Sequence, residues 1–175
     1  SINRGTYRPV SVYAADINGD GVTELPRAVL MAGYDEAAAT DALFMLDWYA
    51  YSADAAPELD KTTYQNVSDG WSLDIDPAWH DQITAVKTNE SGISAVEFAQ
   101  DTGGGRIPLF TIYCATGTLQ DYYIGRTDLL QRGQTSQAVY FARFSEDAQQ
   151  SAIQIDANGV KERFSLLTQA WSNEW

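Results

Sequence analysis

The residues best suited to chemistry lie in one acidic stretch near the start of the chain, from Asp16 to Glu24. Oxygen-bearing side chains recur there at every second position, and Gly19 and Gly21 allow the chain to bend between them. Calcium takes about six to eight oxygen ligands, and close carboxylates repel one another until a cation joins them. The stretch therefore predicts one structural Ca2+ ion. Its expected ligands are Asp16, Asn18, Asp20, the carbonyl of Val22, and Glu24.

The spacing of this stretch differs from that of an EF-hand. Counting from Asp16, the twelfth position, where an EF-hand needs a carboxylate, holds Arg27, and Glu24 stands at the ninth. The alternative to an ion site is a pair of tight turns, because Asn-Gly and Asp-Gly are favoured in turns that bind nothing. Both interpretations stay open.

The stretch resembles a known kind of loop. Its pattern, Asp-x-Asn-x-Asp-Gly-x-x-Glu, is similar to the calcium loops of FG-GAP and VCBS-type repeats in extracellular proteins, which are entered from a β-strand. Here that strand is expected at 10–14. In such repeats the loop is structural and has no catalytic role. With Asp69-Gly70-Trp71 and Pro77-Ala78-Trp79, the chain also resembles uncharacterised bacterial secreted lipoproteins, which implies an extracellular or cell-envelope location.

The composition excludes several classes of function. The formal charge of -13 opposes binding to nucleic acid or to anionic membrane surfaces. An apolar content of 45% and an aromatic content of 12% predict a folded chain. No apolar run has the length of a transmembrane segment. Because the chain starts without an initiator Met, we expect a mature or trimmed form from which any export signal has been removed.

Nucleophilic and zinc catalysis find little support in the sequence. The chain has one histidine, His80, and one cysteine, Cys114, and it lacks a Gly-x-Ser-x-Gly elbow. Cys114 lies in an apolar run, where a buried and unreactive thiol is expected. One His and one Cys cannot supply the three or four ligands of a zinc site. We expect no catalytic residues.

A carbohydrate surface is the main alternative to a calcium-stabilised domain. Asp74 and Asp76 lie two residues apart, and Trp71 and Trp79 flank them. Paired carboxylates beside indoles occur in sugar-binding modules and in glycoside hydrolases. The simpler interpretation is that Trp71 belongs to a strand's core face and the carboxylates to its solvated face. Burial of both indoles would count against a sugar site.

The rest of the chain predicts a sheet-rich domain. Short apolar or alternating runs are separated by turn signals, and Asn89-Glu90-Ser91-Gly92 predicts a hairpin between two of them. The run at 43–51 is apolar enough to be buried on both faces. The expected strands are 10–14, 43–51, 71–75, 83–88, 93–98, 109–115 and 138–144.

Helices are expected to be few. Val160, Phe164, Leu167 and Trp171 form one helical stripe, with Asp156 as N-cap. Asp76 and Pro77 favour a short helical turn, and 119–131 is ambiguous between helix and strand.

Together these patterns predict a single α+β domain, 1–175, with an antiparallel sheet and a C-terminal helix. The Asp-Gly-Trp and Pro-x-Trp elements resemble the α/β/α sandwiches of the Mog1 and PsbP type, and a β-sandwich is the alternative. The expected function is a non-catalytic extracellular or cell-envelope domain, stabilised by one Ca2+, that binds an unknown ligand or protein or acts in adhesion. The alternatives are a carbohydrate-active protein and a structural spacer of a larger envelope protein.

Overall fold

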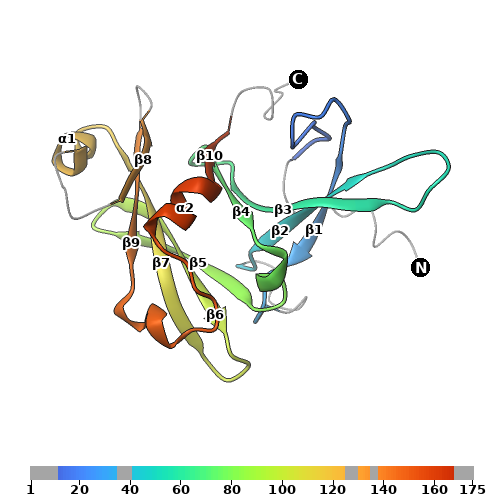
Figure 1. Cartoon of the computed structure of the whole chain (residues 1–175). Helices are drawn as coiled ribbons and strands as arrows, with labels where there is room; N and C mark the ends of the chain where they lie inside the picture. Colours follow the sequence, from blue (N-terminus) through green and yellow to red (C-terminus); the bar gives the residue numbers. More distant parts are fainter. Residues whose placement is uncertain (1–11, 35–40, 125–129, 135–137, 168–175) are drawn as a thin grey trace.

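Two antiparallel sheets organise the part of the chain that the computed structural model describes, residues 12–34, 41–124, 130–134 and 138–167 (Figure 1). Each sheet has five strands within these residues. The first sheet runs in the order β1 (Leu25–Leu30), β2 (Phe44–Ala50), β3 (Glu58–Asn66), β4 (Trp71–Ile75) and β10 (Phe164–Leu166). The second runs β5 (Ile83–Glu90), β6 (Ile93–Asp101), β7 (Arg106–Thr116), β9 (Ala138–Phe144) and β8 (Leu130–Gln134).

The helices in the described residues are short. They are α1 (Leu119–Ile124) and α2 (Ala157–Arg163), with 3-10 turns η2 (Pro77–Trp79) and η3 (Glu146–Gln150). Asp156 caps α2 by accepting a hydrogen bond from the Gly159 N–H at 2.8 Å, as its position before the helix predicts. Asp76 likewise caps η2 through the Ala78 N–H. None of these helices combines the length and apolar content needed to cross a membrane.

One hydrophobic core joins the two sheets. Alternate residues of β4 and β6 point inward, because side chains of a strand alternate between its faces. Trp71 from the first sheet lies 6.3 Å from Phe98 of the second, ring centroid to ring centroid, and Tyr64 meets the same phenyl ring edge-on at 5.3 Å. Phe98 in turn stacks on Phe110 of β7 at 5.1 Å. This aromatic chain crosses from sheet to sheet, so each sheet buries its apolar face against the other.

Most of the strands expected from the sequence are present. The runs at 43–51, 71–75, 83–88, 93–98, 109–115 and 138–144 correspond to β2, β4, β5, β6, β7 and β9. The predicted hairpin joins β5 to β6, and Ser91 and Gly92 make its turn with φ of 54° and 84°. The sequence patterns did not reveal β1 or β3. Of the two, β3 carries few apolar residues, whereas β1 is a short, mostly apolar run interrupted by Pro26 and Arg27. In the ambiguous segment, 119–124 is helical and 130–134 is a strand.

The C-terminal helix prediction is wrong beyond Arg163. Phe164 has an extended backbone, with φ -82° and ψ 135°, and pairs with Leu73 of β4. Its ring lies 5.8 Å from Trp71 and 5.6 Å from Tyr140 of β9, so both sheets enclose it. Since a continued helix would give up these pairings with β4, the chain turns into β10 instead. Trp171, the last residue of the predicted stripe, lies outside the described residues.

The strand expected at 10–14 is also corrected. Residues 12–14 are not in a strand, and Ala15 makes only an isolated bridge with Glu24. Val10 lies outside the described residues. The coarse fold prediction holds: the described chain is mostly antiparallel sheet with few helices, as an α+β or β-rich fold requires.

Candidate functional site

The acidic stretch forms a closed loop before β1. Ala15 and Glu24 exchange two backbone hydrogen bonds, of 3.1 and 2.9 Å, which close its base. Inside the loop the Asp16 carboxylate accepts three backbone N–H groups, from Gly19 at 2.7 Å, Asp20 at 3.1 Å and Gly21 at 2.9 Å. Both glycines have positive φ, 81° and 89°, which a side chain would disfavour. Asp16 therefore organises the turn that the two glycines permit.

Asn18 and Asp20 complete the polar interior of the loop. The Asp20 carboxylate accepts the Val22 N–H at 2.7 Å and the Asn18 side-chain amide at 2.9 Å. These two donors lower the pKa of Asp20, with the Val22 N–H as the larger cause. A carboxylate oxygen has two lone pairs. One oxygen of Asp16 and both of Asp20 thus each keep a lone pair beyond these hydrogen bonds within the loop.

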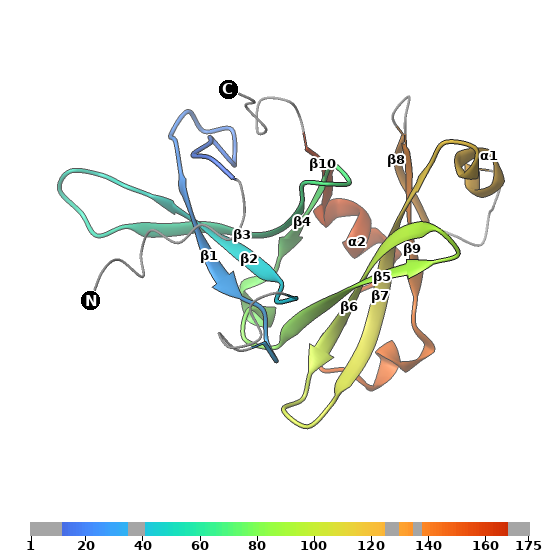
Figure 2. The ribbon, with the colours of Figure 1, turned by 180° about the vertical axis from the view of Figure 1, so that it is seen from behind.

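The loop is anchored on the outer face of the first sheet, the face turned away from the second. Ile17 is buried there in a small cluster with Val12, Leu46 and Trp48. The Trp48 indole N–H also donates to the Thr63 hydroxyl at 2.9 Å. Figure 2 shows the loop at the start of β1, near the β2–β3 hairpin. Ile17 is the one apolar residue between Asp16 and Gly21, and it is the sequence signal for this anchor.

Glu24 is the unusual member of the loop. It is fully buried, at 0% exposure. One of its carboxylate oxygens accepts the Ile17 N–H at 2.9 Å, and the other, Oε1, is buried with no hydrogen-bond partner. A buried carboxylate with an unpaired oxygen costs several kcal/mol if it stays charged. A cation beside Oε1 would offset that cost.

The residues of this loop have the ligand atoms that a hard cation prefers, but their side chains are not already arranged around an ion. All the candidate ligand atoms are oxygens, as calcium requires, and Oε1 of Glu24 has no other partner. Within the described ranges, no three Asp, Glu, His or Cys side chains stand together as a ready metal cluster. The carboxylates of Asp16 and Asp20 are instead turned to backbone N–H groups. If an ion binds, the residues that would hold it are Asp16, Asn18, Asp20, Val22 and Glu24.

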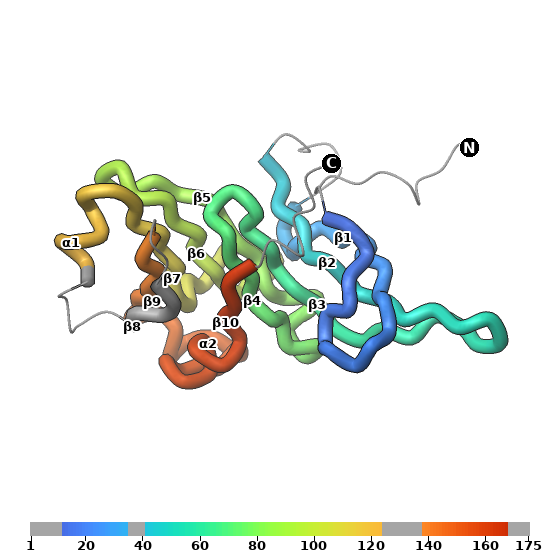
Figure 3. Tube along the Cα trace, turned by 90° about the horizontal axis from the view of Figure 1, so that it is seen from above, coloured from blue at the N-terminus to red at the C-terminus, as the bar shows by residue number. Residues whose placement is uncertain are grey.

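Asp60 is a neighbour of the loop that the sequence did not reveal. It lies on β3, 42 residues beyond Asn18, and accepts a hydrogen bond from the Asn18 amide at 3.1 Å. Figure 3 shows the loop running beside β3. Nothing in local spacing connects residues this far apart, so only the pairing of β1, β2 and β3 reveals the contact.

The predicted carbohydrate surface is not assembled as the sequence indicated. Trp71 is 1% exposed and belongs to the core between the sheets. Asp74 pairs with Lys61 at 2.9 Å, and Asp76 pairs with Arg163 at 2.9 Å. Trp79 is 9% exposed, and the Arg163 guanidinium lies 4.6 Å from the centroid of its ring. Each carboxylate therefore has its own cation, and Trp71 offers no face to a sugar.

His80 makes a contact that the sequence did not predict. Its Nε2 lies 3.0 and 3.2 Å from the two carboxylate oxygens of Asp47, a buried residue of β2. Its Nδ1 lies 3.2 Å from Asp81. Partial burial by itself lowers the pKa of His80, but the hydrogen bonds and charges of Asp81 and Asp47 outweigh it and raise the pKa. An Asp inside an apolar strand was the signal for this pair.

Cys114 lies where the sequence placed it, in the apolar interior of β7. Burial raises the pKa of its thiol to about 11. Because the thiolate is the reactive form, this thiol is a poor nucleophile near neutral pH.

The FG-GAP resemblance covers the nine residues from Asp16 to Glu24 of a 175-residue chain. No protein-family model matches this chain, and no match was found among curated proteins or solved structures.

Proposed function

We propose that this chain is a non-catalytic domain of the cell envelope or the extracellular space that one Ca2+ ion stabilises. The ion binds in the loop from Asp16 to Glu24 and holds it on the first sheet. The domain acts in binding or adhesion. A folded spacer within a larger envelope protein is the alternative, and it would use the same ion.

The observation that carries this proposal is the buried Glu24 carboxylate with its unpartnered oxygen. A cation at that oxygen would balance the buried charge and draw on the spare lone pairs of Asp16 and Asp20. The rest of the loop supports the same interpretation, because its other candidate side-chain ligands are also oxygens and lie within a short turn. A pair of tight turns at Asn18-Gly19 and Asp20-Gly21 that binds no ion is the competing explanation.

The expected affinity of such a site supports an extracellular location as part of this proposal. Extracellular calcium modules bind weakly, with dissociation constants of about 10⁻⁴ to 10⁻³ M. A loop whose ligands are partly exposed and partly engaged with backbone N–H groups suits this range. The charge of -13 makes the surface attractive to cations.

The finer fold assignment is also a proposal. The core shared by the two sheets, with helices at its margins, favours a two-sheet sandwich over the α/β/α arrangement of the Mog1 and PsbP type.

Thermal unfolding of metal-stripped protein with calcium, with magnesium and with EDTA tests the ion site. We expect calcium to raise the melting temperature and magnesium to have little effect, because Mg2+ requires stricter octahedral geometry. Asp20→Ala should lower the melting temperature in calcium and have little further effect in EDTA. Asp54→Ala, which removes an exposed carboxylate outside the loop, is the matched control. Equal melting temperatures in calcium and EDTA would reject the ion.

A further inference from the structure

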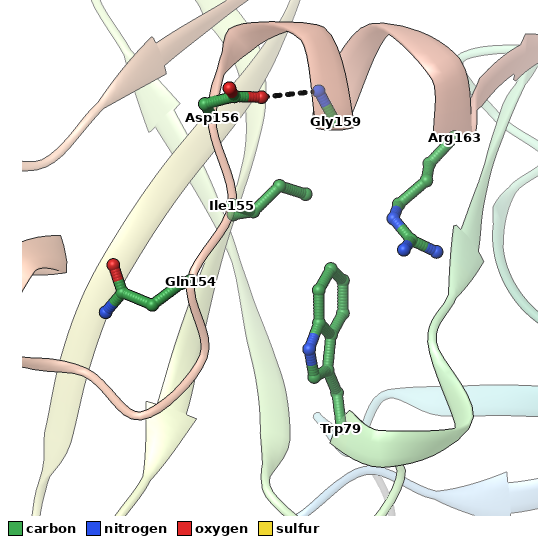
Figure 4. Close-up of a pocket in the computed structure, with 6 residues that line it drawn as sticks. All are labelled: Trp79, Gln154, Ile155, Asp156, Gly159 and Arg163. Atoms are coloured by element: carbon green, nitrogen blue, oxygen red, sulfur yellow. Dashed lines mark hydrogen bonds between the residues drawn. The ribbon is translucent and has the colours of Figure 1, made fainter.

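A pocket of about 400 Å³ lies between α2, η2 and the segment that leads into α2 (Figure 4). It is separate from the acidic loop, and its volume is near the lower end for small-molecule sites. Figure 4 shows the indole of Trp79, the side chain of Ile155 and the guanidinium of Arg163 pointing into the same space. Its lining residues are Trp79, Gln154, Ile155, Asp156, Gly159 and Arg163.

The packing around Gly159 maintains the shape of this pocket. A Cβ atom at this position would lie 2.9 Å from Cγ1 of Ile155, too close for a real contact. Ile155 therefore sits against the helix backbone, where it precedes the N-cap Asp156. With any other residue at 159, Ile155 would have to move toward the pocket or the helix would have to shift.

The charges of the pocket disfavour anionic ligands. Arg163 is the cation among the lining residues, and Asp76 neutralises it at 2.9 Å. Asp156 adds a carboxylate. With the net charge of -13 on the chain, a phosphate or carboxylate ligand would meet a negative potential.

The pocket offers hydrogen-bonding groups of both kinds. The Trp79 indole N–H has no hydrogen-bond partner among the described residues and is not one of their fully enclosed polar atoms, so it keeps some contact with solvent although the side chain is only 9% exposed. One Asp156 oxygen accepts the Gly159 N–H at 2.8 Å, and the other makes no hydrogen bond among the described residues. The Gln154 amide nitrogen donates to the Ser151 carbonyl, which leaves its own oxygen as an acceptor. Ile155 supplies an apolar surface between these groups.

We propose that this pocket binds a neutral, polyhydroxylated ring, such as a monosaccharide unit of a glycan. Hydroxyl groups both donate and accept, so they can pair with the indole N–H and with the Asp156 and Gln154 oxygens among the lining residues. The C–H face of the ring packs on Ile155. Because Arg163 already covers one face of Trp79, the indole contributes its N–H more than a stacking surface. With few contacts and an open mouth, binding is weak, in the millimolar range.

The indole N–H makes a direct test possible. Five tryptophans give separate indole signals in a 1H–15N correlation spectrum, and Trp79→Phe assigns the Trp79 signal by its disappearance. We titrate the whole chain with glucose, galactose, mannose and N-acetylglucosamine, and separately with phosphate and acetate. The Trp79 signal is expected to shift saturably with at least one sugar, while the signals of buried Trp48 and Trp71 stay in place.

Asp156→Ser sharpens this test, because Ser also caps a helix but lacks the second oxygen. It should weaken sugar binding about tenfold, the loss expected for one hydrogen bond to a charged group. Glu162→Gln removes a charge from the same helix outside the pocket and should leave binding unchanged. A Trp79 signal that no sugar moves, or that phosphate or acetate moves instead, would overturn the proposal. Equal affinity in the Asp156→Ser variant would also overturn it.

Discussion

Two carboxylates are buried in this protein in different ways. Asp47 on β2 lies against His80, and the distance from its Oδ1 to Nε2 of His80 is 3.0 Å. The same oxygen accepts a hydrogen bond from the Thr62 hydroxyl at 2.7 Å. In Glu24, at the end of the acidic loop, one carboxylate oxygen accepts the Ile17 N–H and the other has no hydrogen-bond partner. Protein groups therefore satisfy the Asp47 carboxylate, whereas the Glu24 carboxylate lacks a hydrogen-bond partner at one oxygen. A buried carboxylate oxygen that no protein group satisfies indicates a group from outside the chain, and the proposed Ca2+ ion would be that group.

The largest change in stability is expected for a substitution at Glu24. Glu24→Gln keeps an oxygen for the Ile17 N–H but removes the charge that a cation would bind. With calcium at about 100 times its dissociation constant, we expect a loss of about 2–3 kcal/mol in the free energy of unfolding. In EDTA the variant should equal or exceed the original protein, since no buried charge remains. Urea unfolding in both buffers measures this. A similar loss in both would show that Glu24 is structural only.

Asp47 should behave in the opposite way, with no dependence on calcium. Asp47→Ala leaves the Thr62 hydroxyl and His80 without their buried acceptor, at a cost of about 2 kcal/mol. The same urea measurement should give this loss in calcium and in EDTA alike. Asp81→Ala, which removes the exposed partner of His80, is the control and should cost much less. If the stability loss of Asp47→Ala depended on calcium, Asp47 and Glu24 would not differ in the way proposed here.

The Asp47 contact should also respond to pH. The pKa of His80 in the folded protein is above its ordinary value of 6.5. Its stabilising contribution is therefore fully present below about pH 6.5 and is lost as the pH rises through the folded value. Unfolding of the original protein and of His80→Gln should be compared from about pH 5.5 to about pH 8.5. The difference in stability between them is expected to shrink with rising pH. A constant difference would mean that charge at His80 is irrelevant.

The smallest effect is expected at the surface contact of the loop. Asp60→Ala removes the hydrogen bond from Asn18 to β3, which is exposed, and should cost about 0.5 kcal/mol. Glu58→Ala, on the same strand and also exposed, is the comparison and should be neutral. If Asp60→Ala cost more than Glu24→Gln in calcium, the loop would be held from its surface and not from its buried side.

Much of the sheet could be predicted because its strands carry their own pattern. β4 alternates Trp71, Leu73 and Ile75 with polar residues, and the β5–β6 hairpin has its turn in Ser91-Gly92. β3 begins with exposed polar residues and gains its burial only beside β2 and β4, so no local pattern predicted it. The C-terminal prediction failed for a similar reason. Phe164 fits both a helical stripe and the alternation of β10, and the pairing with Leu73 decides between them.

By itself, the sequence determined the acidic loop, most of the strands, the two helix caps and the burial of Cys114. These depend on neighbours within a few residues, where side-chain type and backbone conformation are directly coupled. The tertiary structure decided that Glu24 is buried and incomplete, that Asp47 meets His80 and that Trp71 belongs to the core. It also brought Trp79 to Arg163 beside Ile155. Each of these joins residues far apart in the chain, and burial depends on which faces the sheets turn toward one another.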